Sequence, residues 1–267
     1  MEKINLSVIL PIKSALTKDF EVYFDKCIKS IQNQEILPEE LLIVHTQEEN
    51  LVKFLKEYDF DKLNTKLIEW VKKPNFQSQI NFGVENSNCE YVSFLEFDDE
   101  YSNVWFRNIK KYITVYPNVD GFLPMVVDVD EKGMFLGFTN EATFAANFSQ
   151  EIGILSNETL LQYQNFQSSG MVINKQKFLN FGGFKATMKL TFVYEFFLRM
   201  TYNNLVIMTI PKIGYKHTTL REGSIFWNYK NGKNIMTEDE VKFWISTAKK
   251  EHFFTIDRNI KFVSETN

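Results

Sequence analysis

Apolar residues in the first hundred positions fall into short continuous runs, separated by stretches with helical spacing. Residues 6–11 form an apolar run that ends at a proline, which is typical of a strand buried on both faces. Residues 20–34 follow with apolar side chains at helical spacing. The alternation continues with predicted strands at 41–44, 66–71 and 91–97 and predicted helices at 48–58 and 75–86. This order predicts an α/β fold with a mostly parallel central sheet flanked by helices, whose ligands would collect at the carboxyl ends of the strands.

The pattern changes in the second half of the chain. Residues 122–138 look like two strands joined by a glycine-ended turn at 130–133, which predicts a hairpin. Asp128 and Asp130 flank that turn, and we interpret them as a solvated hairpin end. Further helices are predicted at 104–116, 175–180, 192–201 and 236–250 and strands at 170–173 and 205–211, whereas 141–166 shows no strong pattern. We find no repeat or linker and therefore predict one domain, residues 1–267, with a smaller mixed sheet in its second half.

Three acids stand where the predicted strand 91–97 ends: Asp98, Asp99 and Glu100. Carboxylates crowded together repel one another, so they need either water or a bound cation. A hard divalent cation such as Mg²⁺ or Mn²⁺ prefers oxygen ligands and can share them with substrate phosphates. The alternative is a solvated acidic turn, and these three residues alone do not separate the two hypotheses.

Composition excludes several classes of protein. Hydrophobic residues make up 44% and charged residues 24%, which is ordinary for a globular chain, and the net charge of -4 excludes a general nucleic-acid binder. Cys27 and Cys89 lack the spacing of a metal or redox pair and are predicted to be buried. The sequence contains no run of 18 apolar residues, so no membrane span is predicted, and the first residues lack the features of a signal peptide. We therefore expect a cytoplasmic protein.

Six motifs in order carry a resemblance to a known family. They are SVILP at 7–11, CIKSIQNQ at 27–34, the P-x-E-L phrase with its strand at 38–44, FLEFDDE at 94–100, GGF at 182–184 before YEFFLRM at 194–200, and a basic-and-serine segment from Lys216 to Ser224. Together they resemble the family-two glycosyltransferases of the GT-A, Rossmann-like fold, over about residues 6–226. The resemblance implies a nucleotide-binding half at 1–101, an acceptor half at 102–235, and a C-terminal helix and tail at 236–267.

The same resemblance implies a metal-dependent transferase that moves a sugar from a nucleotide-sugar donor to a hydroxyl of a glycan or related acceptor, with inversion. Asp98 and Asp99 would hold Mn²⁺ or Mg²⁺ against the donor diphosphate, and Glu96 would lie near the donor ribose. The full set of implied donor-binding residues is Pro11, His45, Thr46, Asn81, Glu96, Asp98, Lys216, His217 and Arg221. For His217 the alternative is an ordinary hydrogen-bonded histidine.

Two departures from the family pattern affect the expected chemistry. His45 and Thr46 lie where the family usually has a base-reading aspartate, so UDP is only the default nucleotide. Phe192 and Val193 lie where an inverting member carries its Glu-Asp pair, and an inverting reaction needs a general base. Glu195 is the nearest acid and our candidate base, but it lies about 200° around the helix from Val193. A buried glutamate that holds a loop or helix end is an equal alternative. Other acids, including Glu222, could act as the base instead.

Two other functions compete with sugar transfer. The missing acid at Val193 and the replaced acid at His45 are compatible with a degenerate member that binds a nucleotide or glycan without turnover. Nucleotidyl transfer to a sugar phosphate would use a similar α/β layout. It would require a glycine-rich phosphate loop after the first strand, and residues 13–16 (KSAL) do not form one.

Overall fold

The structure is a computed structural model that describes residues 2–16, 19–145, 152–219, 221–232 and 235–253. Strands and helices alternate through the first half, as the apolar pattern predicted. The strands are β1 (Lys3–Ile12), β2 (Leu37–His45), β3 (Thr65–Glu69), β4 (Tyr91–Phe94), β5 (Glu100–Tyr101), β6 (Gly121–Val129), β7 (Phe135–Thr139), β8 (Gly153–Ile154), β9 (Val172–Asn174) and β10 (Ile207–Thr218). The helices are α1 (Phe20–Gln32), α2 (Glu49–Glu57), α3 (Phe76–Asn86), α4 (Trp105–Val115), η1 (Ala142–Phe144), α5 (Asn157–Gln162), α6 (Lys175–Asn180), α7 (Phe192–Tyr202), α8 (Ile225–Lys230) and α9 (Glu238–Glu251).

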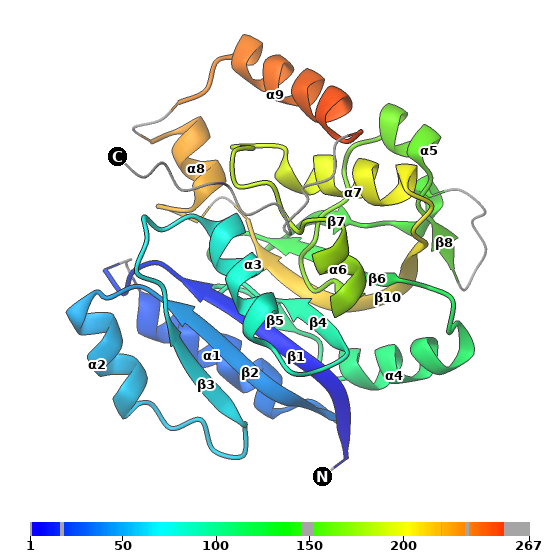
Figure 1. Ribbon diagram of the computed structural model, residues 1–267. Coiled ribbons are helices and arrows are strands. Elements are labelled where there is room, and N and C mark those ends of the chain that lie inside the picture. The colour runs from blue at the N-terminus through cyan, green and yellow to red at the C-terminus, as the bar shows by residue number, and fades with distance from the viewer. Residues whose placement is uncertain (1, 17–18, 146–151, 220, 233–234, 254–267) are drawn as a thin grey trace, which may run out of the picture.

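The ten described strands belong to one hydrogen-bonded sheet with the order β3-β2-β1-β4-β9-β6-β10-β5, which β7 and β8 join through β6 and β10. Strands β3, β2, β1 and β4 run parallel, as Figure 1 shows. The pair β6 and β10 is also parallel, whereas β5, β7, β8 and β9 are antiparallel to their neighbours. This confirms the α/β, mostly parallel prediction. The mixed strands of the second half continue the same sheet.

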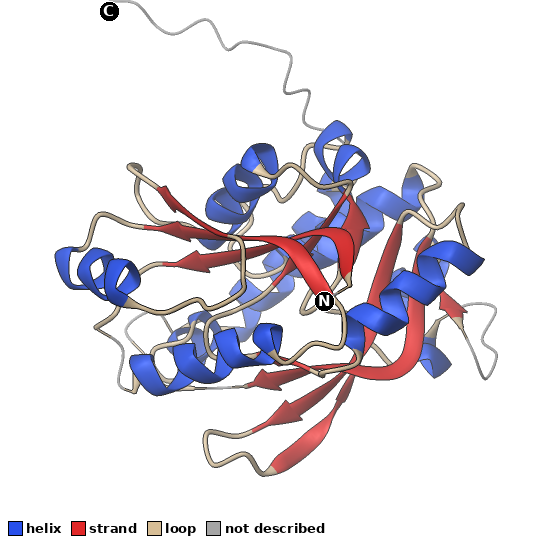
Figure 2. Ribbon diagram, turned by 90° about the horizontal axis from the view of Figure 1, so that it is seen from below, coloured by secondary structure: helices blue, strands red, loops and turns tan. Residues whose placement is uncertain are grey.

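Side chains of β1 divide the core between the two faces of the sheet. Leu6, Val8 and Leu10 join the cluster that contains α1 and α4, and Ile9 joins the cluster that contains α3, α6 and α7. Helices accordingly cover both faces in the turned view of Figure 2. A strand buried on both faces favours apolar residues at nearly every position, and this explains the apolar run, in which buried Ser7 donates to Glu40. Cys27 and Cys89 are free and buried, as predicted.

Two strand ends differ from the sequence-based expectation, and both differences affect the site. Strand β4 ends at Phe94 rather than at residue 97, so the acidic residues lie in a turn. Strand β10 does not stop at Pro211 but continues to Thr218. Register shifts against β6 at Ile210/Ile213 and Ile213/Tyr215 absorb the proline, which cannot donate to the ladder. The long strand carries Lys216 and His217 to the acidic turn.

In the part of the chain that the structure describes, no helix is both long and apolar enough to cross a membrane.

Gly214 of β10 tests how tightly this strand is packed. Gly214→Ala should lower the free energy of unfolding by about 1–3 kcal/mol, because the new Cβ would lie 2.4 Å from Cε3 of Trp105 and 2.7 Å from Cβ of Pro124. Trp105 is fully buried and its Nε1 donates to the Gly170 carbonyl at 3.1 Å, so a shift of this side chain would lose packing contacts and a hydrogen bond. Urea unfolding measures the change.

Gly137 of β7 provides the matched control, since no atom lies within 4 Å of its added Cβ. Gly137→Ala should change the free energy of unfolding by less than about 0.5 kcal/mol. Equal effects at the two glycines would show that β10 is not tightly packed against Trp105.

Candidate active site

The acidic turn, which contains Glu96, Asp98, Asp99 and Glu100, follows β4 and is held in place by hydrogen bonds of its backbone. The Asp99 amide donates to the Glu96 carbonyl at 3.1 Å, which closes the turn. The Glu96 amide donates to the Tyr215 hydroxyl at 3.1 Å, and Tyr215 is fully buried on β10. The turn is therefore fixed to the sheet by its backbone, and its side chains are left to face the carboxyl end of the strands.

Three successive acids of this turn pair with three basic residues at the end of β10. Asp98 Oδ2 lies 2.5 Å from Arg221 Nε, Asp99 Oδ2 lies 3.0 Å from His217 Nδ1, and Glu100 bonds Lys216. The Thr218 amide also donates to Asp99 at 2.8 Å. We call the residues Asp98–Glu100 with Lys216, His217 and Arg221 the ion-pair ladder.

Arg221 is the most enclosed base of the ion-pair ladder. Its guanidinium lies 4.8 Å from the ring centre of Phe97 and 5.8 Å from that of Tyr23, and it donates to the Glu222 carbonyl at 2.9 Å. Only 5% of Arg221 is exposed. A planar guanidinium with aromatic rings beside it is suited to bind a carboxylate or a phosphate in the same position.

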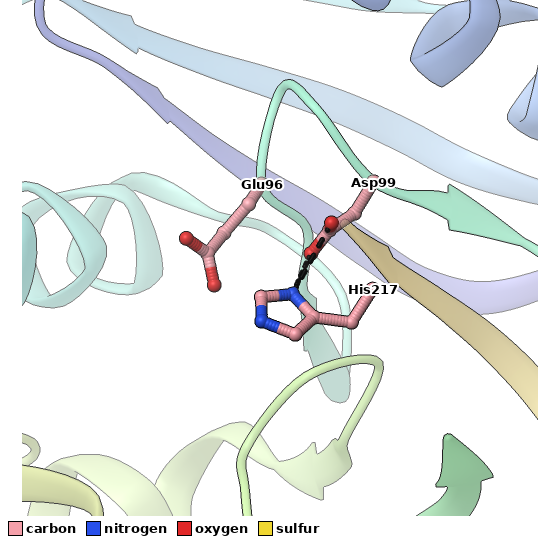
Figure 3. A group of neighbouring side chains, drawn as sticks. All are labelled: Glu96, Asp99 and His217. Carbon is pink, nitrogen blue, oxygen red and sulfur yellow. Dashed lines mark hydrogen bonds and ion pairs between the residues drawn. The ribbon is translucent and has the colours of Figure 1, made fainter. Parts of the chain in front are cut away.

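Glu96 differs from the other acids, because its carboxylate accepts no hydrogen bond from another described residue. In Figure 3 it points toward the imidazole of His217, whose Nδ1 bonds Asp99. One ligand atom from each of Glu96, Asp99 and His217 lies within 4.8 Å of the others. Two carboxylates and an imidazole suit Mn²⁺ and, less closely, Mg²⁺. The structure thus groups Asp99 with Glu96 and His217, whereas the sequence predicted a metal pair of Asp98 and Asp99.

Charge crowding shifts the acid–base properties of this group. Burial, reinforced by the Asp99 charge, raises the pKa of Glu96 to about 8. Burial would lower the pKa of His217, but the charge and hydrogen bond of Asp99 outweigh it and raise that pKa to about 10. Burial and the Asp99 charge also raise the pKa of Asp98 against the opposing effect of Arg221. The site therefore holds protons that a cation or a ligand would displace.

A pocket of about 300 Å³ opens beside the acidic turn. Glu96, Asp98 and His217 form its charged end. Its other lining residues are Phe76, Gln164, Asn165, Phe166, Gln167, Ser168, Ser169, Leu190, Thr191, Phe192, Val193, Tyr194, Thr218, Thr219, Ser224 and Ile245. Sequence reasoning named Phe192, Val193 and Ser224 but singled out few of the others, because most lie in loops without periodicity.

The remaining predicted donor residues lie outside the lining of this pocket. Pro11, His45 and Thr46 gather where β1 and β2 end, and Thr46 Oγ1 donates to the Lys13 carbonyl at 2.7 Å. This places them at the edge expected of a nucleoside site. Asn81 instead bonds the backbone of Phe184, accepting from its amide at 2.9 Å and donating to its carbonyl at 2.7 Å. Asn81 therefore holds the GGF turn, and nothing in its contacts indicates donor binding.

Glu195 is fully buried and does not line the pocket. Arg199 donates to both of its carboxylate oxygens, at 2.8 and 2.9 Å, and Lys185 Nζ lies 3.0 Å from Oε1. Arg199 also donates to the carbonyls of Phe181 and Gly183. These contacts favour the structural alternative, in which Glu195 ties the GGF turn to α7, over a catalytic role.

The charged pocket lies at the carboxyl ends of the parallel strands, where open α/β sheets bind their ligands. Residues 7–168 match the family described as "Glycosyl transferase family 2". The chain belongs to that family. No curated protein matches it in sequence.

Solved structures of S. aureus TarS share the fold. The structure of TarS 1-349 in complex with UDP has 17% sequence identity and a TM-score of 0.60, over 100% of this chain and 76% of that chain. The TarS 1-349 complex with UDP-GlcNAc has 17% identity and a TM-score of 0.61, over 95% and 73%. A further TarS structure has 17% identity and a TM-score of 0.62, and this chain spans 46% of it.

Removing the carboxylate of Glu195 should destabilise the protein. Glu195→Gln leaves the cations of Lys185 and Arg199 buried without their anion, which should cost about 3–5 kcal/mol of unfolding free energy. Urea unfolding measures this. Asp239→Asn, at an exposed ion pair with Lys242 on α9, is the control and should change it by less than about 0.5 kcal/mol. A stable Glu195→Gln protein that lost only turnover would instead support a catalytic Glu195.

Glu96 should make the metal-free protein less stable as the pH rises. Its folded-state pKa is about 8 against an ordinary value of 4.5, so between these values the folded protein holds a proton that the unfolded chain has released. Stability should fall across that window, and Glu96→Gln should become progressively more stable than the native protein from pH 5 to pH 8. Urea unfolding at both pH values tests this. Exposed Glu90, changed to Gln, should show no such difference.

Proposed function

We propose that the protein is a metal-dependent glycosyltransferase that moves a sugar from a UDP-sugar to a hydroxyl of a glycan or related acceptor, with inversion. The observation that carries the proposal is the charged end of the pocket, where Glu96, Asp98 and His217 line the space and Arg221 pairs with Asp98 from behind the lining. A diphosphate leaving group requires both a cation site and fixed positive charge. Membership of the family supports sugar transfer as the reaction.

Glu96, Asp99 and His217 would hold the metal, Mn²⁺ or Mg²⁺. A bound cation would supply stabilisation of the negative charge that develops on the leaving diphosphate. Metal ligation requires the deprotonated carboxylate of Glu96 and the neutral imidazole of His217, so affinity should rise with pH through their pKa values of about 8 and about 10. Arg221 and Lys216 supply fixed positive charge beside the same group. Arg221 can exchange the carboxylate of Asp98 for phosphate oxygens of similar geometry.

Pro11, His45 and Thr46 would receive the nucleoside at the end of β1 and β2. UDP is the nucleotide we propose, because TarS structures of the same fold hold UDP and UDP-GlcNAc. The hydrogen bonds of His45 Nδ1 and Thr46 Oγ1 to backbone carbonyls would shape this edge in place of the usual acid. A cytoplasmic location stays a prediction from the sequence.

The general base that we propose differs from the one usual in the family. Of the residues that line the pocket, only Glu96 and Asp98 carry carboxylates, and the metal would occupy Glu96. We assign the base to Asp98, which becomes free to accept the acceptor proton once Arg221 binds phosphate. Burial, together with the Asp99 charge, raises the Asp98 pKa, and a more basic carboxylate suits that role.

Val193 supports a second candidate function. It lines the pocket with an apolar side chain, and Glu195 is enclosed by cations elsewhere. If Asp98 remained bound to Arg221 after the donor entered, the protein would bind nucleotide or glycan without turnover. The two functions share a donor site and differ in the chemical step.

The donor site is tested by melting temperature with UDP, GDP and ADP, each with and without Mn²⁺. UDP with Mn²⁺ at a hundred times its Kd should raise the melting temperature by about 5 °C or more, because a ligand of the native state stabilises it by about 2.7 kcal/mol. Asp99→Asn should abolish the Mn²⁺-dependent part, and Asp239→Asn, exposed on α9, should retain it.

If no nucleotide raises the melting temperature, the proposed metal and donor site is wrong. A shift without release of UDP from any UDP-sugar and acceptor would reject transfer and leave the binding function. Release of UDP that is lost in Asp98→Asn, with the UDP shift retained, would support Asp98 as the base.

A further inference from the structure

Apolar side chains from separate elements line the pocket together with the charged residues of the acidic turn and β10. Phe76 comes from α3, Leu190 from the segment before α7, Val193 from α7 and Ile245 from α9. We call these four residues the apolar wall. Each of the four side chains is partly exposed, so part of its apolar surface is not buried in the core and is available to the pocket.

Separate contacts hold the apolar wall in place. Thr191 Oγ1 donates to the Trp244 carbonyl at 2.9 Å, which joins the start of α7 to α9 beside Ile245. Lys185 Nζ donates to the Glu251 carbonyl at 2.5 Å and so fixes the end of α9 to the Glu195 cluster. The ring of Phe76 packs against Phe192 with centroids 5.7 Å apart. The apolar wall is therefore a preformed surface.

Apart from Glu96, Asp98 and His217, the polar residues that line the pocket are neutral. Gln164, Asn165 and Ser168 line the pocket, and their side chains make no hydrogen bond to another described residue. Ser168 is only 7% exposed and lines the pocket, so the pocket is where its hydroxyl can meet a ligand. The charged lining residues that the structure describes are Glu96, Asp98 and His217, at the donor end.

We propose that the acceptor is an uncharged glycoside with an apolar aglycone, an aliphatic chain or an aromatic ring, which lies on the apolar wall. The amides and the Ser168 hydroxyl would bind sugar hydroxyls of the same molecule. A phosphate or carboxylate on the acceptor would find no cation beside the apolar wall among the described residues that line the pocket. The inference rests on the proposed function, because only a transferase has an acceptor. Binding of the glycoside is tested separately from turnover.

The test is calorimetric titration of the protein, with UDP and Mn²⁺ present, with methyl and hexyl β-glucoside and β-galactoside and with methyl β-glucuronide. Burying two of the added methylenes should favour the hexyl glycosides by about 10-fold in Kd, at about 0.8 kcal/mol for each methylene. The glucuronide should bind more weakly than the methyl glucoside. Leu190→Asn and Val193→Thr change polarity with little change in volume, and each should bring the hexyl-to-methyl ratio toward one.

Phe243→Ser is the matched control, because Phe243 lies on α9 with Ile245 but is 60% exposed and does not line the pocket. It should leave the ratio unchanged. Equal Kd values for hexyl and methyl glycosides, tighter binding of the glucuronide, or an equal loss in Phe243→Ser would overturn the inference. A hexyl preference without any UDP-induced shift in melting temperature would uphold the apolar site and reject the proposed transferase.

Discussion

The candidate site depends on the ion-pair ladder between the acidic turn and the end of β10. Four acids at positions 96–100 could not lie together at the edge of a sheet unless opposite charges were fixed beside them. Strand β10 supplies those charges because it continues past Pro211, and its pairing with β6 and β5 sets Lys216 opposite Glu100. The same contacts leave the Glu96 carboxylate without a hydrogen bond from any residue that the structure describes. A sheet register, rather than a local motif, therefore decides which carboxylate is available to a cation.

Much of the fold was predictable from the sequence because burial on both faces of a sheet leaves unbroken apolar runs. Residues 6–11 and 41–44 show this, and α1, α3 and α9 followed from helical spacing and caps. The acidic turn was also visible. The partners of that turn were only partly visible, since ion pairs between residues more than a hundred positions apart leave no periodic signal. The grouping of Asp99 with Glu96 and His217 follows from the length of β10. The sequence did not predict that length, because Pro211 looked like the end of the strand.

Glu195 shows why a retained acid is a weak guide to chemistry. In the sequence it stood two positions from the expected base and looked like a substitute. In the structure its two oxygens bind Arg199 and Lys185, and through them it joins the GGF turn, α7 and α9. A buried charge with two cationic partners loses its value as a base, because proton transfer would leave both cations uncompensated. Its contribution to the pocket is indirect, through the position of α7 and α9.

The pocket accordingly has two ends with different physical demands. At one end, Glu96, Asp98 and His217 gather charge in a partly enclosed space, where a cation or phosphate can replace one partner only if it keeps the remaining charges paired. At the other end, Val193 stands where a carboxylate would be expected, within a surface of apolar side chains. An acid at that position would place a charge among apolar side chains and would disfavour an apolar ligand. The absence of the usual base and the presence of the apolar wall are thus one feature, and any proton acceptor for the reaction has to come from the charged end.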